Sequence, residues 1–545
     1  MGSQLFLVPD PLKLEFSGKW YKFDGFNNLP DFLAKVYQLK KGSWDIRKIK
    51  RDGQGVSVSE GLVEIWGDKG TSYASLIQLA KNKPGFLPEA TFEEPTDFKF
   101  RGFHLDIARG GVPNEKAFEQ ILKWLFLLKY NKFGIYFEDL FPWKGKKEIG
   151  KSRGRLTDLE WKHILEIGAK LGIDIFPSLE LLGHMEHFLK IPKYNKFSEL
   201  WWMGYDCLDL SNKEARKFAV SLLEDAIDKS SSKLINLGGD ETWVLGRGRS
   251  LDKLHKYMGP DLYLDHYREL VHTSLRKGKI PMLWGDMLTG MYLTSDGRGS
   301  WAKVVKDSLW NEVLIANWDY EPLERDHFIS KIREIGHKNK QIACPALHNW
   351  STFYPDFEPA IKNVTSFLEA ARSEHLEGYM ITAWGDAGQE CLLSFLYPLI
   401  LTSADFSANQ DSWLIKYSLF SGESLDLAKI RFSAGNASVG PAIRNVLYSP
   451  LNFLTHRREL PQDWKLKMKQ FYEQVKDKRL PPDLELIRKM VYNSLNLNNK
   501  IFDEESYLDM VHKYEQAWLN ERKFNGLENV VSRLMGTYEA KRLGF

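Results

Sequence analysis

The sequence is poor in cysteine and nearly without net charge. Its 545 residues contain three cysteines, Cys207, Cys344 and Cys391, which lie far apart and form no CxxC motif. This spacing excludes a disulfide framework and a Cys-rich zinc site, and it favours reduced thiols in a cytosolic protein. The 75 Lys and Arg residues against 72 Asp and Glu leave a formal charge of +3. We therefore expect no nucleic-acid partner, because sequence-independent binding needs a basic excess.

Long apolar runs are also missing. The most apolar stretch, WLFLLKY at 124–130, is broken by lysine and tyrosine and falls short of the ~18 residues that cross a bilayer. The first residues, MGSQLFLVPDPLKLEF, lack a basic segment followed by an apolar one. With 43% hydrophobic and 27% charged residues, the chain has the composition of a globular protein. We expect a cytoplasmic protein with no membrane partner.

The patterning divides the chain into three regions. Residues 1–95 mix short strand-like runs with one helical pattern, YASLIQLAKN, and predict a small N-terminal α+β domain. This region ends in FLPEATFEEPTDFK (86–99), which we interpret as a linker. Residues 405–545 show no strand pattern, and from Pro461 they are charged and helix-periodic, which predicts an α-helical C-terminal domain.

Between these regions, residues 96–404 alternate apolar strand-like runs with amphipathic helical patterns. Apolar runs of this kind predict strands that are buried on both faces of a parallel sheet. Eight strand–helix units in about 300 residues are typical of a (β/α)8 TIM barrel. A doubly wound open sheet is the alternative, but no GxGxxG motif follows any strand. The expected strands are 100–106, 133–138, 173–179, 234–239, 280–285, 312–317, 341–347 and 377–384.

Polar and aromatic residues follow all eight expected strands. In a TIM barrel the carboxyl ends of the strands meet at one face, where the chemistry takes place. Aromatic walls with carboxylates suit a carbohydrate, although the 18 tryptophans could also serve core packing. The residues at these ends are Asp106, Arg109, Glu138, Asp139, Glu180, His184, Asp240, Glu241, Trp284, Asp286, Trp318, Asp319, Tyr320, His348, Trp350, Trp384 and Asp386.

The adjacent carboxylates Asp240 and Glu241 are the most informative pair. Glycosidases that use two protein carboxylates take them from different strands, at about 5–5.5 Å when retaining and about 6.5–9.5 Å when inverting. Consecutive carboxylates suit a division in which one protonates the leaving oxygen and the other orients a nucleophile within the substrate. The preceding Gly238 and Gly239 allow an unusual turn. A helix N-cap pair is the structural alternative.

The run LINLGGDETW (234–243) resembles a characteristic segment of glycoside hydrolase family 20, the β-N-acetylhexosaminidases. The resemblance extends in order over residues 100–390, with RGFHLDIARG, FPSLELLGH, LWGDM, IANWDY and ITAWGD matching other strand-end segments. It implies catalysis by Asp240 and Glu241. It further implies substrate contacts from Arg109, Asp139, His184, Trp284, Trp318, Tyr320, Trp350, Trp384 and Asp386.

Some segments depart from the family pattern. The second-strand segment is YFEDLFPW, without the histidines of many members, and Asp139 stands where an acidic residue is expected. Tyr320 is our choice for the tyrosine that hydrogen-bonds the acetamido oxygen, with Tyr354 as the reserve. The segment PALHNWSTFY, which supplies His348 and Trp350, departs most.

The resemblance implies an exo-acting, retaining hydrolase of terminal β-linked N-acetylglucosamine or N-acetylgalactosamine, with no metal and no cofactor. The substrate would be an N-acetylhexosamine-terminated oligosaccharide or glycoconjugate, and the C-terminal helices could form a homodimer interface. Two alternatives stay open. One is a glycosidase with two protein carboxylates, such as Glu180 and Glu241, acting on sugars without an acetamido group. The other is a barrel that binds sugar without catalysis.

Overall fold

The computed structural model describes residues 4–200, 202, 204, 206–289, 298–336, 338–386, 388–405, 410–449 and 457–544. Its centre is a closed barrel of eight parallel strands, in the order β10-β11-β12-β13-β6-β7-β8-β9. The barrel strands are β6 (Phe100–Asp106), β7 (Lys132–Tyr136), β8 (Asp174–Ser178), β9 (Leu234–Asn236), β10 (Ile280–Trp284), β11 (Leu314–Trp318), β12 (Gln341–Cys344) and β13 (Gly378–Ala383). The predicted TIM barrel is therefore confirmed.

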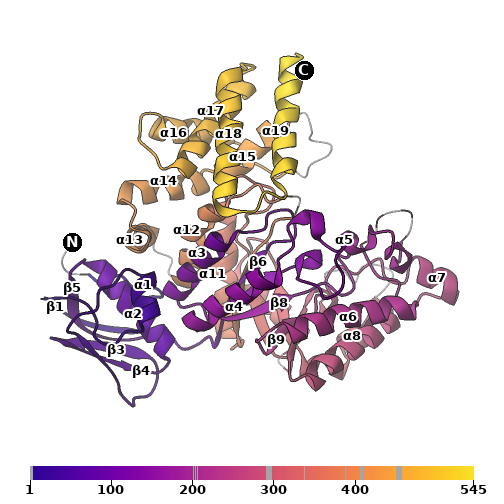
Figure 1. Cartoon of the computed structure of the whole chain (residues 1–545), viewed down its shortest axis with the longest axis horizontal. Coiled ribbons are helices and arrows are strands. Elements are labelled where there is room, and N and C mark those ends of the chain that lie inside the picture. Colours follow the sequence, from indigo (N-terminus) through magenta and orange to yellow (C-terminus); the bar gives the residue numbers. More distant parts are fainter. Residues whose placement is uncertain are drawn as a thin grey trace.

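Helices follow every barrel strand and surround the barrel (Figure 1). Their ends follow local chemistry: Asn114 caps α3 by accepting the Ala117 N–H, and Thr157 forms a capping box with Glu160 at α4. The helices are α3 (Glu115–Leu127), α4 (Asp158–Leu171), α5 (Glu186–Leu189), α6 (Lys213–Asp228), α7 (Arg249–Leu254), α8 (Gly259–Arg276), α9 (Arg298–Val305), α10 (Arg325–Ile335), α11 (Phe357–Ser373) and α12 (Tyr397–Asp405).

The N-terminal region folds into a five-stranded sheet of order β1-β5-β3-β4-β2. Its elements are β1 (Lys13–Lys22), α1 (Asp31–Val36), β2 (Asp45–Lys48), β3 (Gly55–Ser59), β4 (Leu62–Trp66), α2 (Lys69–Asn82) and β5 (Phe86–Glu93). The predicted linker at 86–99 is wrong over its first eight residues. They form β5, which pairs with both β1 and β3 and buries alternate side chains such as Leu87 and Phe92.

After α12 the described chain is helical, as the sequence predicts. The helices are α13 (Gln410–Ser421), α14 (Leu425–Asn436), α15 (Val439–Leu447), α16 (Trp464–Val475), α17 (Pro482–Asn498), α18 (Glu504–Glu521) and α19 (Leu527–Arg542). Helices α17, α18 and α19 extend away from the barrel, and the C-terminus lies at the far end of α19 (Figure 1). Within the described residues, no helix is long and apolar enough to cross a membrane.

The barrel interior has its own apolar cluster, separate from the core that the helices share with the sheets. It includes Phe100, Phe176, Met282 and Met380. Towards the carboxyl ends of the strands the cluster becomes aromatic, and the partly exposed residues Trp318, Tyr320 and Trp350 pack against it. The barrel core thus ends in an aromatic surface at the face where the predicted site lies.

Candidate active site

The Asp240–Glu241 pair follows two glycines in left-handed backbone conformations. Gly238 and Gly239, just after β9, have φ values of 72° and 97°. A Cβ atom on Gly238 would lie 2.3 Å from Oε2 of Glu180, and one on Gly239 would lie 2.6 Å from Cδ1 of Leu283. Only glycine fits both the backbone and the space here. The unusual turn that the sequence predicts is confirmed.

A histidine joins the two carboxylates. Nε2 of His184 lies 3.4 Å from Oδ2 of Asp240 and 3.3 Å from Oε2 of Glu241. Burial opposes a charged imidazole, but Asp240 and Glu241 together raise the pKa of His184 well above its ordinary value. The Asp240 side chain is 12% exposed and that of Glu241 is 40% exposed. His184 therefore joins an inner and an outer acidic side chain at the mouth of the barrel.

Asp286, which follows β10, supports this turn from below. Its Oδ2 accepts the backbone N–H of Glu241 at 2.9 Å, and its Oδ1 accepts Nε1–H of Trp318 at 3.2 Å. Burial, together with the charge of Asp240, raises the pKa of Asp286. Sequence reasoning noted Asp286 at a strand end but did not choose it for the site. Its position in the LWGDM segment was the available signal.

Glu180 lies under the same turn, but away from the mouth. It is 2% exposed, and neither carboxylate oxygen has a hydrogen-bond partner among the described residues. Burial first, and then the nearby Asp240 charge, raise the pKa of Glu180 well above its ordinary value. Glu180 is buried beneath the turn at Gly238, away from the mouth, and is therefore poorly placed to attack a sugar. This placement weighs against Glu180 and Glu241 acting as an acid and nucleophile pair.

Arg109 lies at the centre of a second charged group. Its NH1 is 3.1 Å from Oδ2 of Asp106 and its Nε is 3.1 Å from Oε1 of Glu138. The guanidinium carbon lies 4.7 Å from the ring centre of Tyr136 and 5.6 Å from that of Trp384. Its side chain keeps 15% exposure. Arg109 is thus held by two carboxylates, Asp106 and Glu138, and keeps part of its side chain exposed.

Of the two acidic residues that follow β7, Glu138 rather than Asp139 reaches Arg109. Asp139 is 1% exposed and pairs with Arg153, which also donates to the carbonyl oxygen of Ala108. Burial raises the pKa of Asp139 to about 6 and that of Glu138 to about 7. The structure therefore places Asp139 outside the Arg109 cluster, and sequence reasoning missed the role of its neighbour.

The aromatic residues form a connected wall. Trp384 donates Nε1–H to the Tyr320 hydroxyl at 2.7 Å, and Trp318 stacks on Tyr320 with ring centres 4.9 Å apart. Trp350 lies 5.6 Å from the Tyr320 ring on the other side. Trp284 is completely buried and packs 5.6 Å from Trp384. The structure thus makes Trp284 a support beneath the wall, while the other four rings build the wall itself.

The two tyrosine candidates have different surroundings. Tyr354 is completely buried and donates its hydroxyl to the carbonyl oxygen of Arg431 at 2.9 Å, so it is turned towards the C-terminal helices.

His348 is also buried and supports the other candidate, Tyr320. Its Nε2 lies 2.7 Å from the Tyr320 carbonyl oxygen, and its Nδ1 lies 3.2 Å from Arg458. Burial lowers the pKa of His348 to about 3. His348 is thus a neutral support for Tyr320, which favours Tyr320 as the pocket tyrosine.

The two remaining strand-end aspartates differ in exposure. Asp386 follows β13, is exposed, and has a φ of 34°. Burial opposes the charge of Arg109, but the charges of Glu138, Asp106 and Asp386 raise its pKa well above the ordinary value. Asp319 is instead buried and paired, 2.9 Å from Nζ of Lys331. Asp386 is therefore the carboxylate that reaches the mouth from this side.

One cluster has the residue types that bind a cation. Ligand atoms of Glu138, His184 and Glu186 lie within 4.8 Å of one another. Two of these side chains already have polar or charged partners, because Glu138 contacts Arg109 and His184 contacts Asp240 and Glu241. An ion-pair network therefore accounts for their proximity.

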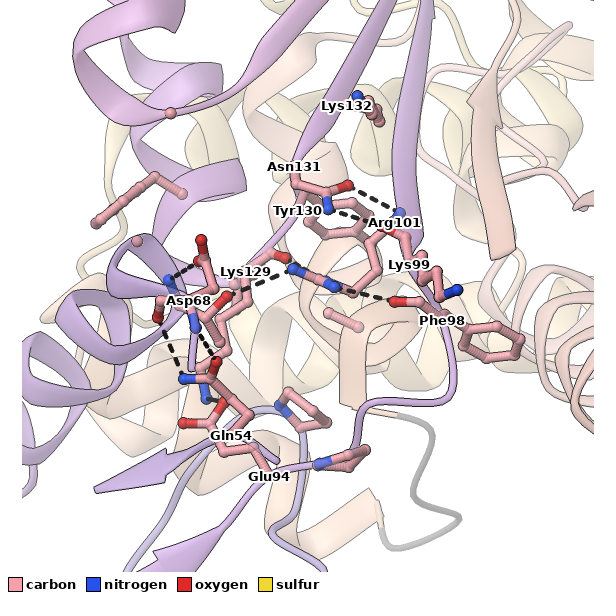
Figure 2. Close-up of a pocket in the computed structure, with 18 of the residues that line it drawn as sticks. Gln54, Asp68, Glu94, Phe98, Lys99, Arg101, Lys129, Tyr130, Asn131 and Lys132 are labelled. Carbon is pink, nitrogen blue, oxygen red and sulfur yellow. Dashed lines mark hydrogen bonds and ion pairs between the residues drawn. The ribbon is translucent and has the colours of Figure 1, made fainter. Parts of the chain in front are cut away.

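A cavity of about 480 Å³ lies at the opposite end of the barrel, against the N-terminal domain (Figure 2). Its charges are largely paired with one another. Nζ of Lys129 is 3.1 Å from Glu94, and Arg101 donates to the carbonyl oxygens of Phe98 and Lys129. The Lys129–Glu94 ion pair joins the two domains, and the cavity is remote from the strand ends where the site is predicted.

Comparison with known proteins agrees with the barrel fold. Human hexosaminidase D is 24% identical over 317 residues, which are 56% of this chain and 63% of that relative. The β-N-acetylhexosaminidase structure from Bacteroides fragilis is 17% identical, covers 77% of this chain and 95% of its own, and gives a TM-score of 0.60. The Flavobacterium johnsoniae chitobiase structure is 15% identical, covers 98% of this chain and 99% of its own, and gives a TM-score of 0.58.

The family assignment depends on the barrel. The chain spans less than two thirds of the human relative's length, at 63%, and the two solved structures share its fold. The model of the family 20 catalytic domain matches residues 98–398, which is more than half of the chain and contains every predicted site residue. This protein belongs to glycosyl hydrolase family 20.

Proposed function

We propose that this chain hydrolyses terminal, non-reducing β-linked N-acetylglucosamine or N-acetylgalactosamine, with the acetamido group of the substrate as the nucleophile. The observation that carries the proposal is the His184 bridge between the consecutive carboxylates Asp240 and Glu241. Asp240 and Glu241 come from one turn, and Glu180, the other carboxylate considered as a nucleophile, is buried beneath that turn. The substrate must then supply the nucleophile, and an acetamido oxygen can do so.

In the first step, Asp240 accepts the acetamido N–H and turns the acetamido oxygen towards C1 of the sugar. Glu241 gives its proton to the glycosidic oxygen as the bond from C1 to that oxygen breaks. The acetamido oxygen bonds to C1, and the positive charge spreads over an oxazolinium ring beside the Asp240 carboxylate. Tethering the nucleophile can lower the barrier by about 7–11 kcal/mol in ideal intramolecular cases.

In the second step, water attacks C1 from the face that the leaving group has vacated. Glu241, now a carboxylate, takes a proton from that water, and the C1 bond to the acetamido oxygen breaks. Two displacements at C1 retain the β configuration. The 40% exposure of Glu241 fits a group that meets both a leaving group and water.

The sugar ring would lie against the aromatic wall, with Arg109 and Asp386 binding its hydroxyls. Tyr320 would hydrogen-bond the acetamido oxygen through its hydroxyl, which accepts Nε1–H of Trp384 within the aromatic wall. Rings of Trp318, Trp350 and Trp384 offer apolar faces to the C–H groups of a pyranose.

We also propose a cytoplasmic location, since Cys207, Cys344 and Cys391 are all buried free thiols. The substrate would be an oligosaccharide or glycoconjugate that ends in N-acetylhexosamine. We further propose that the C-terminal helices form a homodimer interface. The proposed domains end at residues 95 and 404.

The test is the time course of the product anomer. A 4-nitrophenyl β-N-acetylglucosaminide and its galacto counterpart are incubated with the protein, and proton NMR follows the sugar as it appears. We expect the β anomer first, followed by slow mutarotation. The α anomer as first product would contradict two displacements at C1, and absence of hydrolysis of both would contradict the activity.

A further inference from the structure

The turn between α18 and α19 reaches the face of the barrel that carries the sugar site, although it lies more than 100 residues after the last strand. The N–H of Lys523 donates to the Val112 carbonyl oxygen at 2.9 Å, and the N–H of Asn114 donates to the Glu521 carbonyl oxygen at 3.0 Å. Residues 521–526 therefore pair with the loop that follows β6, which is the loop that contains Arg109.

The backbones approach most closely beside Arg109 itself. A Cβ atom on Gly526 would lie 1.6 Å from the carbonyl oxygen of Gly110, and Gly526 has a φ of 94°. Any other residue at position 526 would push the neighbour of Arg109 out of place.

Arg522 joins this turn to the charged group around Arg109. Arg522 is 2% exposed, and its guanidinium donates to the carbonyl oxygens of Gln389 and, at 2.6 Å, Cys391. Gln389 in turn donates Nε2–H to the carbonyl oxygen of Asp106 at 2.8 Å. The carboxylate of Asp106 then holds Arg109. Three contacts therefore connect a C-terminal arginine to the arginine that faces the sugar.

The same turn touches the loops after two other strands. Glu521 accepts the backbone N–H groups of Leu393 and Ser394, in the loop after β13. Asn525 donates to the Ser152 carbonyl oxygen at 2.9 Å, beside Arg153 in the loop after β7. Each loop also carries a strand-end carboxylate of the candidate site, so the turn contacts the loops after three barrel strands, β6, β7 and β13.

We propose that residues 521–526 are a positioning element of the sugar site, in which Arg522 acts through Gln389 and Asp106 on Arg109. The C-terminal helical region would then be a part of the pocket's construction and not an appended domain. The kinetic test of this inference rests on the proposed hydrolysis, whereas the structural contacts do not. Arg522 touches no substrate, so its effect must pass through Arg109.

A double-mutant cycle tests this path. Arg109→Lys, Arg522→Lys and the double variant are compared by kcat/KM on 4-nitrophenyl β-N-acetylglucosaminide. We expect Arg522→Lys alone to lower kcat/KM by about tenfold to a hundredfold, mainly through KM, because a small misplacement of a binding group is costly. The double variant should be no worse than Arg109→Lys, since residues on one path are not additive. Losses that multiply would overturn the proposal.

The control is Arg431, which is also buried but pairs with Glu423 and Asp483 within the C-terminal region. Arg431→Lys should leave KM unchanged, and any loss it causes should multiply with that of Arg109→Lys. Gln389→Ala breaks the same path from the barrel side, and should reproduce Arg522→Lys if the latter does not fold.

Hydrogen exchange separates this inference from the proposed function. In Arg522→Lys we expect faster amide exchange over residues 106–114 than in the wild type, and no such change in Arg431→Lys. If the wild type hydrolyses no glycoside, the proposed function fails and the exchange result alone decides the positioning. Unchanged exchange over residues 106–114 would overturn it.

Discussion

The backbone N–H of Glu241 donates to Oδ2 of Asp286 at 2.9 Å, and this bond fixes the turn that presents the acid of the proposed reaction. The donor is the main chain of Glu241, so a substitution of the Glu241 side chain leaves this hydrogen bond in place. Asp286 is buried and also accepts from Trp318, which ties the turn to the aromatic wall. A substitution at Glu241 therefore tests chemistry with little disturbance of the fold.

We expect Glu241→Gln to lower kcat/KM strongly for poor leaving groups and weakly for good ones. General acid catalysis contributes about a hundredfold to ten-thousandfold, and a 2,4-dinitrophenolate leaves with little help from a proton. Rates for methyl and 2,4-dinitrophenyl β-N-acetylglucosaminides measure the difference. The matched control is Glu180→Gln, because Glu180 lies under the same turn, is buried, and has a pKa that burial raises well above its ordinary value. If Glu241→Gln lowered kcat/KM equally for both leaving groups, Glu241 would not be the general acid.

Asp240→Asn should lower kcat by about a hundredfold or more with little change in KM. In the proposed reaction this carboxylate faces a positive charge that exists only in the transition state and the oxazolinium, so its removal should cost little in the ground state. Steady-state kinetics on an aryl β-N-acetylglucosaminide measure both constants. A variant with the wild-type kcat and a raised KM would mean that Asp240 only binds the substrate.

Tyr320→Phe should lower kcat, whereas Tyr354→Phe should leave it unchanged. Tyr320 lies in the aromatic wall beside Trp384, while Tyr354 donates its hydroxyl to the carbonyl oxygen of Arg431. Losing that buried hydrogen bond should instead cost Tyr354→Phe about 1 kcal/mol of unfolding free energy. Kinetics and thermal unfolding of both variants give the comparison. Loss of kcat in Tyr354→Phe alone would reverse the assignment.

Glu138 should make the protein less stable as the pH rises from about 5 to about 8. Burial raises the pKa of Glu138 to about 7 from its ordinary 4.5, so the folded state keeps a proton that the unfolded state has lost. At about 1.4 kcal/mol for each pKa unit, the stability lost across this range is about 3 kcal/mol. The unfolding free energy of the wild type should therefore fall relative to that of Glu138→Gln as the pH rises.

Urea unfolding at several pH values measures this difference. Glu214→Gln is the control, because Glu214 is an exposed residue that pairs with Lys217 on the surface of α6. Its difference from the wild type should stay constant over the same range. A constant difference for Glu138→Gln as well would show that Glu138 is ionised at every pH tested.

The barrel was predictable because its strands are short, apolar and separated by amphipathic helices. The structure shortens the runs at 312–317 and 341–347 to Leu314–Trp318 and Gln341–Cys344, since the hydrogen-bonded part of each strand is shorter than its apolar run. The linker prediction at 86–99 failed because its Glu and Pro residues masked the alternation of buried side chains in β5.

The limits of sequence reasoning at the site have two physical causes. Glu138 and Asp139 are neighbours, and only the backbone, with a φ of 44° at Glu138, decides which of them faces Arg109. The path from Arg522 to Asp106 joins residues more than 400 positions apart, and no local pattern marks it. By contrast, Asp240 and Glu241 are adjacent in the sequence, so a local pattern was enough to predict the pair.

The most direct test of the account compares substrates with and without the acetamido group. A 4-nitrophenyl β-N-acetylglucosaminide and the matching β-glucoside are assayed side by side, with and without a thiazoline mimic of the oxazolinium. The account predicts rapid hydrolysis of the first, no significant hydrolysis of the second, and tight competitive inhibition by the thiazoline. Equal turnover of the two glycosides, without inhibition, would contradict substrate assistance.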